Sequence, residues 1–303
     1  MSAHEESARI LSVAVDAIGG TPRSGQGEMA QAVDRAIYEE IHLLVQAGTG
    51  TGKSLGYLAP AMAHAVLDDE AVVVATATLA LQAQLAGKDI PAALTAAEKV
   101  LPRRPRAAVL KGRHNHACLH KVRGGSSRPD QDMLLDDADS FAARSDGKGT
   151  DQASELGAEV IALRQWAEQQ AAENGVGDRD DAPAHSQQAW DQVSMRANEC
   201  LGAQNCPFGA QWLAERARER ARDADIVVTN HAMLAIDAMN GGTLLPEHDV
   251  VVIDEAHEVA DRFTGAASVD LWPGRLSTVA RQGLTWLDDD LGADLLDQVD
   301  VLH

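Results

Sequence analysis

Aromatic residues, cysteines and positive charges are all scarce in this chain of 303 residues. Aromatics make up 3% of it, so the apolar content is mostly Ala, Val, Leu and Ile. This suits helices on a buried parallel sheet better than a β-sandwich. Three cysteines are too few, and odd in number, for a disulfide-stapled secreted domain. Because there is also no signal peptide and no run of about 18 apolar residues, we expect a cytoplasmic protein that does not span a membrane.

The charge balance is strongly acidic. The chain has 26 Lys and Arg against 46 Asp and Glu, a formal net charge of −20, which excludes a basic scaffold protein. The exception is a basic island at 99–129, with nine Lys or Arg residues and no acidic residue. It could bind nucleic acid, or it could be an exposed loop that keeps the chain soluble.

Hydrophobic periodicity predicts an α/β fold with a parallel sheet flanked by helices. Short β-branched runs predict strands at 41–46, 72–76, 107–110, 226–229 and 250–254. Helical patterns cover 53–67, 79–86 and 208–224. Between 130 and 181 the sequence becomes acidic and glycine-rich around one predicted helix at 152–174, which indicates an insertion into the α/β domain.

The motif AGTGTGKS at 47–54 predicts a phosphate-binding loop, because it follows a predicted strand and precedes a predicted helix. Glycines let the backbone turn its N–H groups towards phosphate oxygens, and the helix N-terminus adds partial positive charge. We expect Lys53 to reach the β- and γ-phosphates of ATP and Ser54 to bind Mg²⁺. A glycine-rich turn without a ligand is the alternative. The candidate nucleotide-binding residues of the loop are Ala47, Gly48, Thr49, Gly50, Thr51, Gly52, Lys53 and Ser54.

A second motif, VVIDEAHEVA at 251–260, places two carboxylates at the end of a predicted strand. Ligands bind at that end of the strands in open α/β sheets. We assign Asp254 to Mg²⁺ and Glu255 to the attacking water. Taken alone, the Asp-Glu pair could simply be an acidic turn, but the phosphate-binding loop earlier in the chain argues against that.

The sequence DEAH at 254–257, together with the phosphate-binding loop, resembles the first motor lobe of a superfamily 2 helicase of the DinG/XPD-like family. The resemblance implies a RecA-like fold and adds His257 to the catalytic set. RSGQGEM at 23–29 resembles the adenine-reading segment of the family, with Gln26 against the base and Arg23 nearby. VVVATATLALQAQL at 72–85 resembles a segment that faces single-stranded DNA through Thr76, Thr78 and Gln82. The resemblance places the basic island on the side of the sheet that carries the single-stranded DNA.

Cysteines carry another part of the resemblance. The family holds a [4Fe-4S] cluster on four thiolates. Cys118, Cys200 and Cys206 match three of them, but Trp212 stands at the fourth position and cannot ligate iron. Three interpretations remain open: a three-thiolate cluster, a site completed by His114, His116 or His120, with zinc as a variant, or ordinary buried thiols.

The resemblance implies four parts: a first part of the RecA-like domain at 1–111, an iron–sulfur-type insertion at 112–208, the rest of the domain at 209–261 and the start of an arch-like helical segment at 262–303. We expect the ATP-binding motor lobe of a 5′ to 3′ DNA helicase in repair or replication, lacking a second motor lobe. Such a chain should bind nucleotide without competent unwinding. The alternatives are a small-molecule phosphotransferase and a regulatory or metal-sensing module that binds nucleotide and DNA without turnover.

Overall fold

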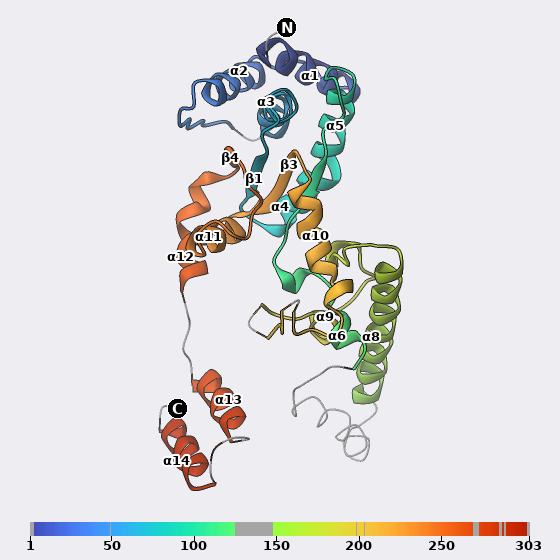
Figure 1. Cartoon of the computed structure of the whole chain (residues 1–303), viewed down its shortest axis with the longest axis vertical. Coiled ribbons are helices and arrows are strands. Elements are labelled where there is room, and N and C mark those ends of the chain that lie inside the picture. Colours follow the sequence, from blue (N-terminus) through green and yellow to red (C-terminus); the bar gives the residue numbers. More distant parts are fainter. Residues whose placement is uncertain are drawn as a thin grey trace.

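The computed structural model describes residues 3–48, 50–124, 148–197, 199–202, 204–268, 273–284, 287 and 289–301. A parallel sheet lies at its centre, with helices on both sides (Figure 1). The sheet order is β2-β3-β1-β4, formed by the strands β1 (Val72–Thr76), β2 (Ala107–Val109), β3 (Ile226–Asn230) and β4 (Val250–Ile253). Each strand pairs in parallel with its neighbours. The α/β class predicted from the apolar composition is therefore confirmed.

Side chains on β1 and β3 alternate between two hydrophobic clusters, as the period of a strand requires. Val72 and Val74 pack on one side, in a cluster with α1 (Ala3–Ala17), α3 (Lys53–Leu67) and α5 (Ile90–Glu98). Val73 packs on the other side with α10 (Leu213–Arg222). Both central strands are buried throughout, which explains why their sequences are continuous apolar runs.

Further helices extend this core. They are α2 (Ser24–Tyr38), α4 (Leu79–Gln84), the π-helical turn η1 (Leu85–Asp89), α11 (His231–Met239), the short turn η5 (Ala256–Glu258) and α12 (Val259–Ala267). The predicted helix at 79–86 thus continues through η1 into α5. The helices α13 (Pro273–Gly283) and α14 (Asp289–Asp300) contact each other. No helix in the described ranges is long and apolar enough to cross a bilayer.

The predicted insertion forms a second hydrophobic cluster, at the lower right of Figure 1. Its described elements are η2 (Arg113–Asn115), α6 (Leu119–Val122), α8 (Lys148–Ala172), η3 (Arg179–Asp181) and α9 (Gln187–Val193), and η4 (Gly209–Gln211) follows them. Trp190 lies fully buried at the centre of this cluster. The helix predicted at 152–174 largely coincides with α8.

One predicted strand is wrong. Residues 41–46 have no regular structure, and Ile41, Leu44 and Val45 are exposed. A β-strand needs a neighbouring strand for its hydrogen bonds, and β4 is an edge strand of the described sheet, with Val251 also partly exposed. The apolar pattern at 41–46 therefore identified a segment suited to a sheet, but that segment has no strand partner among the described residues.

Candidate nucleotide-binding site

The predicted phosphate-binding loop ends where α3 begins, at Lys53. Gly50 and Gly52 have φ angles of +78° and +81°, a left-handed conformation that side chains disfavour. A Cβ atom added at Gly48 or Gly50 would meet no atom within 4 Å. The loop therefore leaves an open cradle at the N-terminus of a helix, which suits phosphate oxygens. Thr49 of this loop lies outside the described residues.

Gln26 ties α2 to this loop. Its side chain is buried, and its Nε2 donates a hydrogen bond of 2.8 Å to the carbonyl oxygen of Gly52. A Cβ atom at Gly52 would lie 2.3 Å from that nitrogen, so the end of the Gln26 side chain would have to move, and the φ of +81° is what favours glycine here. The two motifs therefore meet in space. Between them lies a hollow of about 360 Å³. The residues that line it include Gly25, Glu28, Met29, Val45, Ala47, Gly48 and Thr51.

Lys53 and Glu255 form the contact that joins the two main motifs. Lys53 Nζ lies 2.5 Å from Glu255 Oε1, although the residues are 202 positions apart in the sequence. The hydrogen bond raises the pKa of Lys53 and lowers the pKa of Glu255, so both groups carry their charges at neutral pH. Glu255 has a φ of +55°, unusual for a residue with a side chain. Such backbone strain is found at functional sites.

Asp254 is held by three contacts that the sequence did not predict. Its backbone N–H donates to the carbonyl oxygen of Ala75 at 2.9 Å, and its own carbonyl oxygen lies 2.9 Å from Nε2 of buried His231. Tyr57 donates a hydrogen bond of 3.3 Å from its hydroxyl to Asp254 Oδ2. The contacts orient the carboxylate at the end of β4.

Tyr57 also reaches the side chain of Ser54, three positions earlier on the same helix. Burial, with the charge of Asp254, raises the pKa of Tyr57 well above its usual value, so the phenol stays protonated. One buried side chain therefore connects both predicted Mg²⁺ ligands, Ser54 and Asp254. The signal was present in the sequence, since a residue three positions after Ser54 in a helix shares its face.

His257 lies at the margin of the site. Its Nδ1 is 3.5 Å from Glu255 Oε2, while its side chain is 73% exposed. It can therefore contact bound molecules from the solvent side. The catalytic role predicted for His257 stays a prediction.

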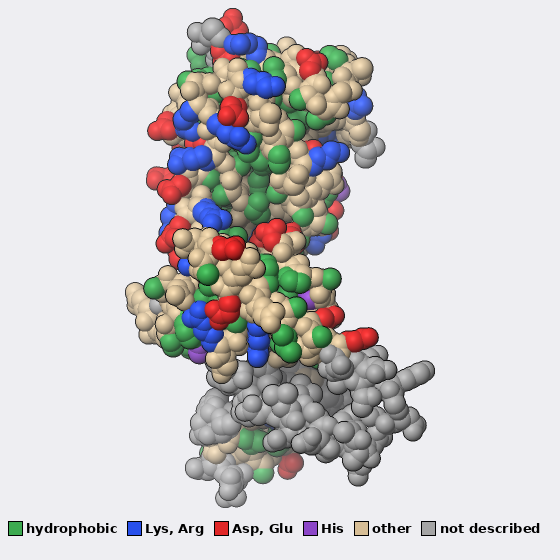
Figure 2. Space-filling view, turned by 90° about the vertical axis from the view of Figure 1, so that its right-hand side faces the viewer, with side chains coloured by type: hydrophobic (Ala, Val, Ile, Leu, Met, Phe, Trp, Pro, Cys, Tyr) green, Lys and Arg blue, Asp and Glu red, His purple; other side chains and the backbone are tan. Residues whose placement is uncertain are grey.

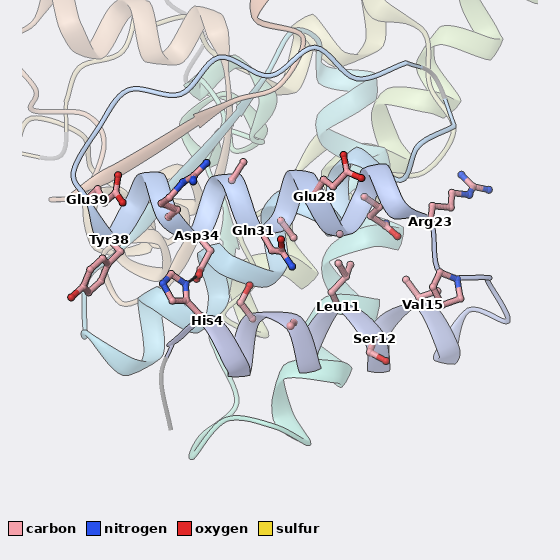
Figure 3. A pocket seen from close by; sticks show the side chains of 18 residues that line it. His4, Leu11, Ser12, Val15, Arg23, Glu28, Gln31, Asp34, Tyr38 and Glu39 are labelled. Atoms are coloured by element: carbon pink, nitrogen blue, oxygen red, sulfur yellow. Dashed lines mark ion pairs between the residues drawn. The ribbon is translucent and has the colours of Figure 1, made fainter.

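A larger groove of about 780 Å³ runs between α1 and α2 (Figure 3). His4 of α1 points towards Asp34 of α2 and forms an ion pair with it across the groove. Arg23 and Gln26, the two residues predicted near adenine, both line it. The groove thus runs along α2 from Arg23 to Glu39.

The predicted DNA-facing segment at 72–85 is mainly structural. Gln82 is fully buried and donates from Nε2 to the carbonyl oxygens of Leu110 and Val228 at 3.2 and 3.0 Å. Thr76 is also buried, and its hydroxyl donates to the carbonyl oxygen of Thr78. The expectation that Gln82 and Thr76 face DNA is therefore wrong, because these side chains satisfy backbone groups inside the sheet.

Most cations of the basic island are paired within the molecule. Lys111 is buried, with Nζ 2.7 Å from both Asp178 and Asp180. Carboxylates also lie within 4 Å of others, in the pairs Arg103–Asp225, Arg103–Asp69, Arg106–Asp225, Arg104–Glu98 and Arg123–Glu168. On the face in Figure 2, positive and negative side chains are interspersed. The predicted basic surface is thus largely neutralised by acidic residues distant in sequence.

The three cysteines are free thiols that form no disulfide. Cys118 is buried at the start of α6, and burial raises the pKa of its thiol, with a smaller effect from nearby Cys200 and Cys206. No set of three or more His, Cys, Asp or Glu side chains in the described ranges is arranged to hold a metal ion. Among the three candidate histidines, His114 contacts Ser194 and His116 contacts the carbonyl of Val176.

The parallel sheet, the glycine cradle and the paired Lys53 and Glu255 define a P-loop, DEAH-box domain of the nucleotide-binding α/β class. Residues 168–276 match the DEAD_2 family. The chain is 47% identical over 274 residues, 90% of its length, to the ATP-dependent helicase DinG of Mycobacterium tuberculosis. Over the length that they share, the chain is related to the DinG/XPD-like helicases, as its motifs predicted.

Two further relatives extend this comparison. The ATP-dependent DNA helicase YoaA of Escherichia coli is 35% identical over 247 residues, covering 80% of this chain and 34% of that protein. The ATP-dependent DNA helicase DinG of Photobacterium profundum is 30% identical over 264 residues, covering 82% of this chain and 34% of that protein. The chain spans about 40% of the length of the mycobacterial relative.

Proposed function

We propose that this chain is the ATP-binding motor lobe of an ATP-dependent DNA helicase. The observation that carries the proposal is the contact of Lys53 with Glu255, which brings the phosphate-binding loop and the DEAH motif into one site. Neither motif needs the other to form a stable turn. Their convergence beyond the end of β4, a strand of the parallel sheet, is what phosphoryl transfer requires.

The residues fit ATP and Mg²⁺ in defined roles. The backbone of Gly48, Gly50 and Gly52 would bind the phosphates, and Lys53 would exchange its contact with Glu255 for a phosphate oxygen. Ser54 and Asp254 would hold Mg²⁺, which neutralises charge on the phosphates. Glu255, released from Lys53, would then orient water. We assign the base to the hollow between α2 and the loop, which is lined by Gly25, the residue before Gln26.

Several parts of the proposal rest on the relatives. Two of them are named DNA helicases, so we propose DNA as the partner. The resemblance of the motifs adds that the DNA is single-stranded and tracked from 5′ to 3′, in repair or replication in the cytoplasm. A second motor lobe would complete the ATP site. The division at residues 111, 208 and 261 is part of the same proposal. The iron–sulfur cluster is not, because Trp212 stands where its fourth thiolate would be.

Replacing Tyr57 with Phe is expected to weaken the contribution of Mg²⁺ to nucleotide binding. Losing one hydrogen bond of about 1 kcal/mol to Asp254 should reduce the Mg²⁺-dependent gain in ATP affinity about 5-fold. Binding of ATP without metal should not change, because the phosphate cradle remains intact. Titrations of a fluorescent ATP analogue with and without Mg²⁺ measure both affinities.

Tyr38→Phe is the matched control, since Tyr38 is an exposed tyrosine on α2. It should behave as the unsubstituted chain does in both titrations. An equal loss of affinity with and without Mg²⁺ in Tyr57→Phe would show that Tyr57 supports the loop in general and not the metal ligands.

Single-stranded DNA binding tests the DNA part of the proposal. Fluorescence anisotropy of a labelled oligonucleotide between 50 and 200 mM salt, about the range over which counterion release is resolved, should give a falling affinity. Each phosphate contact adds about 0.7 to the logarithmic salt slope for a single strand. An affinity independent of salt argues against DNA as the partner.

The variant Arg104→Ala tests whether the basic island makes those phosphate contacts. Arg104 is exposed and paired with exposed Glu98, so its loss should leave the fold intact. We expect an unchanged slope, because internal carboxylates already neutralise the island. A slope lower by about 0.7 would instead show that Arg104 contacts a phosphate, and that the basic island is part of the DNA-binding surface.

A further inference from the structure

Trp212 occupies the position where the resemblance requires the fourth cluster ligand, and its indole is engaged elsewhere. The guanidinium of Arg113 lies over the ring, 4.6 Å from its centroid. Trp212 precedes α10, at the end of the loop that carries Cys200 and Cys206. Arg113 belongs to η2, five residues before Cys118. The stack therefore joins the two chain segments that a fourth thiolate would have joined through iron.

A second arginine, Arg123, contacts the same loop. The guanidinium of Arg123 lies 4.7 Å from the ring centroid of Phe208 and donates to Gln211 at 3.0 Å. It also makes two hydrogen bonds of 2.8 Å to the carboxylate of Glu168 on α8. The segment from Cys206 to Trp212 is thereby held at Phe208, Gln211 and Trp212, by side chains that need no metal.

The insertion also packs around a second hydrophobic core, to which Leu213 of α10 contributes. Fully buried Trp190 packs with Leu163 and Leu213, and its indole N–H donates to the carbonyl oxygen of His114 at 2.7 Å. Small domains use metal sites when they cannot bury enough apolar surface to fold. This insertion buries a tryptophan and several aliphatic side chains, which gives it a source of stability other than a metal.

The donor set does not fit a four-thiolate cluster. It contains three cysteines, and no metal-holding group of three or more side chains occurs within the described part of the chain. His120 is the nearest substitute in the sequence: its Nδ1 is buried without a hydrogen-bond partner, and its ring packs 6.3 Å from that of Phe208. The test must therefore distinguish a protein without a metal from one that binds a metal through the three cysteines and His120.

We propose that the cysteine-bearing insertion folds without an iron–sulfur cluster, and that the Arg113–Trp212 and Arg123–Phe208 stacks hold its loop in the cluster's place. Cys118, Cys200 and Cys206 are then ordinary thiols. Trp212→Cys should restore a complete set of four thiolates.

Metal content tests this directly. The 303-residue chain, its Trp212→Cys variant and a Cys118→Ser/Cys200→Ser/Cys206→Ser variant are reconstituted without oxygen from ferrous iron and sulfide. Iron, zinc and sulfide per chain are then measured, with the visible absorbance. We expect about four irons in Trp212→Cys, and in the unsubstituted chain no more metal than in the triple serine variant. Iron or zinc bound stoichiometrically by the unsubstituted chain above that background overturns the proposal.

Thermal unfolding tests the stacks even if Trp212→Cys fails to fold. Arg113→Met should lower the Tm by about 2–4 °C, since it removes a cation from the indole face. Arg104→Met, at an exposed arginine outside the insertion, should leave the Tm unchanged. Treating the unsubstituted chain with an iron chelator should also have no effect. A Tm that falls with the chelator, or that stays unchanged in Arg113→Met, contradicts the proposal.

Discussion

Steady-state ATP hydrolysis by the 303-residue chain alone is expected to be slow, below about 10⁻² per second. An arginine that reaches the transferring phosphate raises the rate by about 10³ to 10⁵ in related systems. The resemblance assigns that arginine to a second lobe. In the described structure the cation in contact with Glu255 is Lys53, which has its own role in binding phosphate.

The assay is phosphate release with and without single-stranded DNA. Glu255→Gln serves as the control, because residual turnover that belongs to this site should disappear when the water-orienting carboxylate is lost. Turnover of about 1 per second or faster, or robust strand separation, would mean that the described residues or a second copy of the chain complete the site. Tight nucleotide and DNA binding with no turnover at all would favour the regulatory module.

Replacing Lys53 with Ala is expected to abolish most nucleotide binding. The ammonium group makes charged hydrogen bonds to phosphate worth up to about 3 kcal/mol, so affinity for ATP should fall about 100-fold. The variant also leaves Glu255 without its partner, at a site where both side chains are partly exposed. Calorimetric or fluorescence titration with ATP measures the loss.

Lys88→Ala provides the matched control, because Lys88 is an exposed lysine of the same lobe, in η1. It should bind ATP as the unsubstituted chain does. Far-UV circular dichroism of Lys53→Ala should match that of the unsubstituted chain, which separates a lost contact from a lost fold. Undiminished ATP binding in Lys53→Ala would refute the assignment of 47–54 as the phosphate site.

Local patterns predicted the elements that frame the site. The helix predicted at 53–67 and the strand predicted at 72–76 coincide with α3 and β1. Both are largely apolar, and their lengths of 15 and 5 residues separate the helix from the strand. The segment at 41–46 has a similar pattern, yet it forms no strand, because strand formation depends on a partner that periodicity does not reveal.

The partners of the charged groups could not be predicted from local sequence. A count of residues placed a basic island at 99–129, but the count could not show that Asp178, Asp180 and Asp225 fold against it. Likewise, Gln82 belonged to a DNA-facing motif by resemblance and proved to be buried between strands. Salt bridges and buried hydrogen bonds join residues that are distant in sequence, so they are decided only when the chain folds.

The sequence by itself therefore determined the chemistry of this protein: a glycine-rich loop ending in Lys53 and Ser54, a carboxylate pair at Asp254 and Glu255, and Trp212 at a position that calls for cysteine. The tertiary structure alone decided how these groups meet. It placed Lys53 against Glu255, connected Ser54 to Asp254 through Tyr57, and stacked Arg113 on Trp212. Residue type sets what a side chain can bind, whereas long-range packing sets which partner lies within reach.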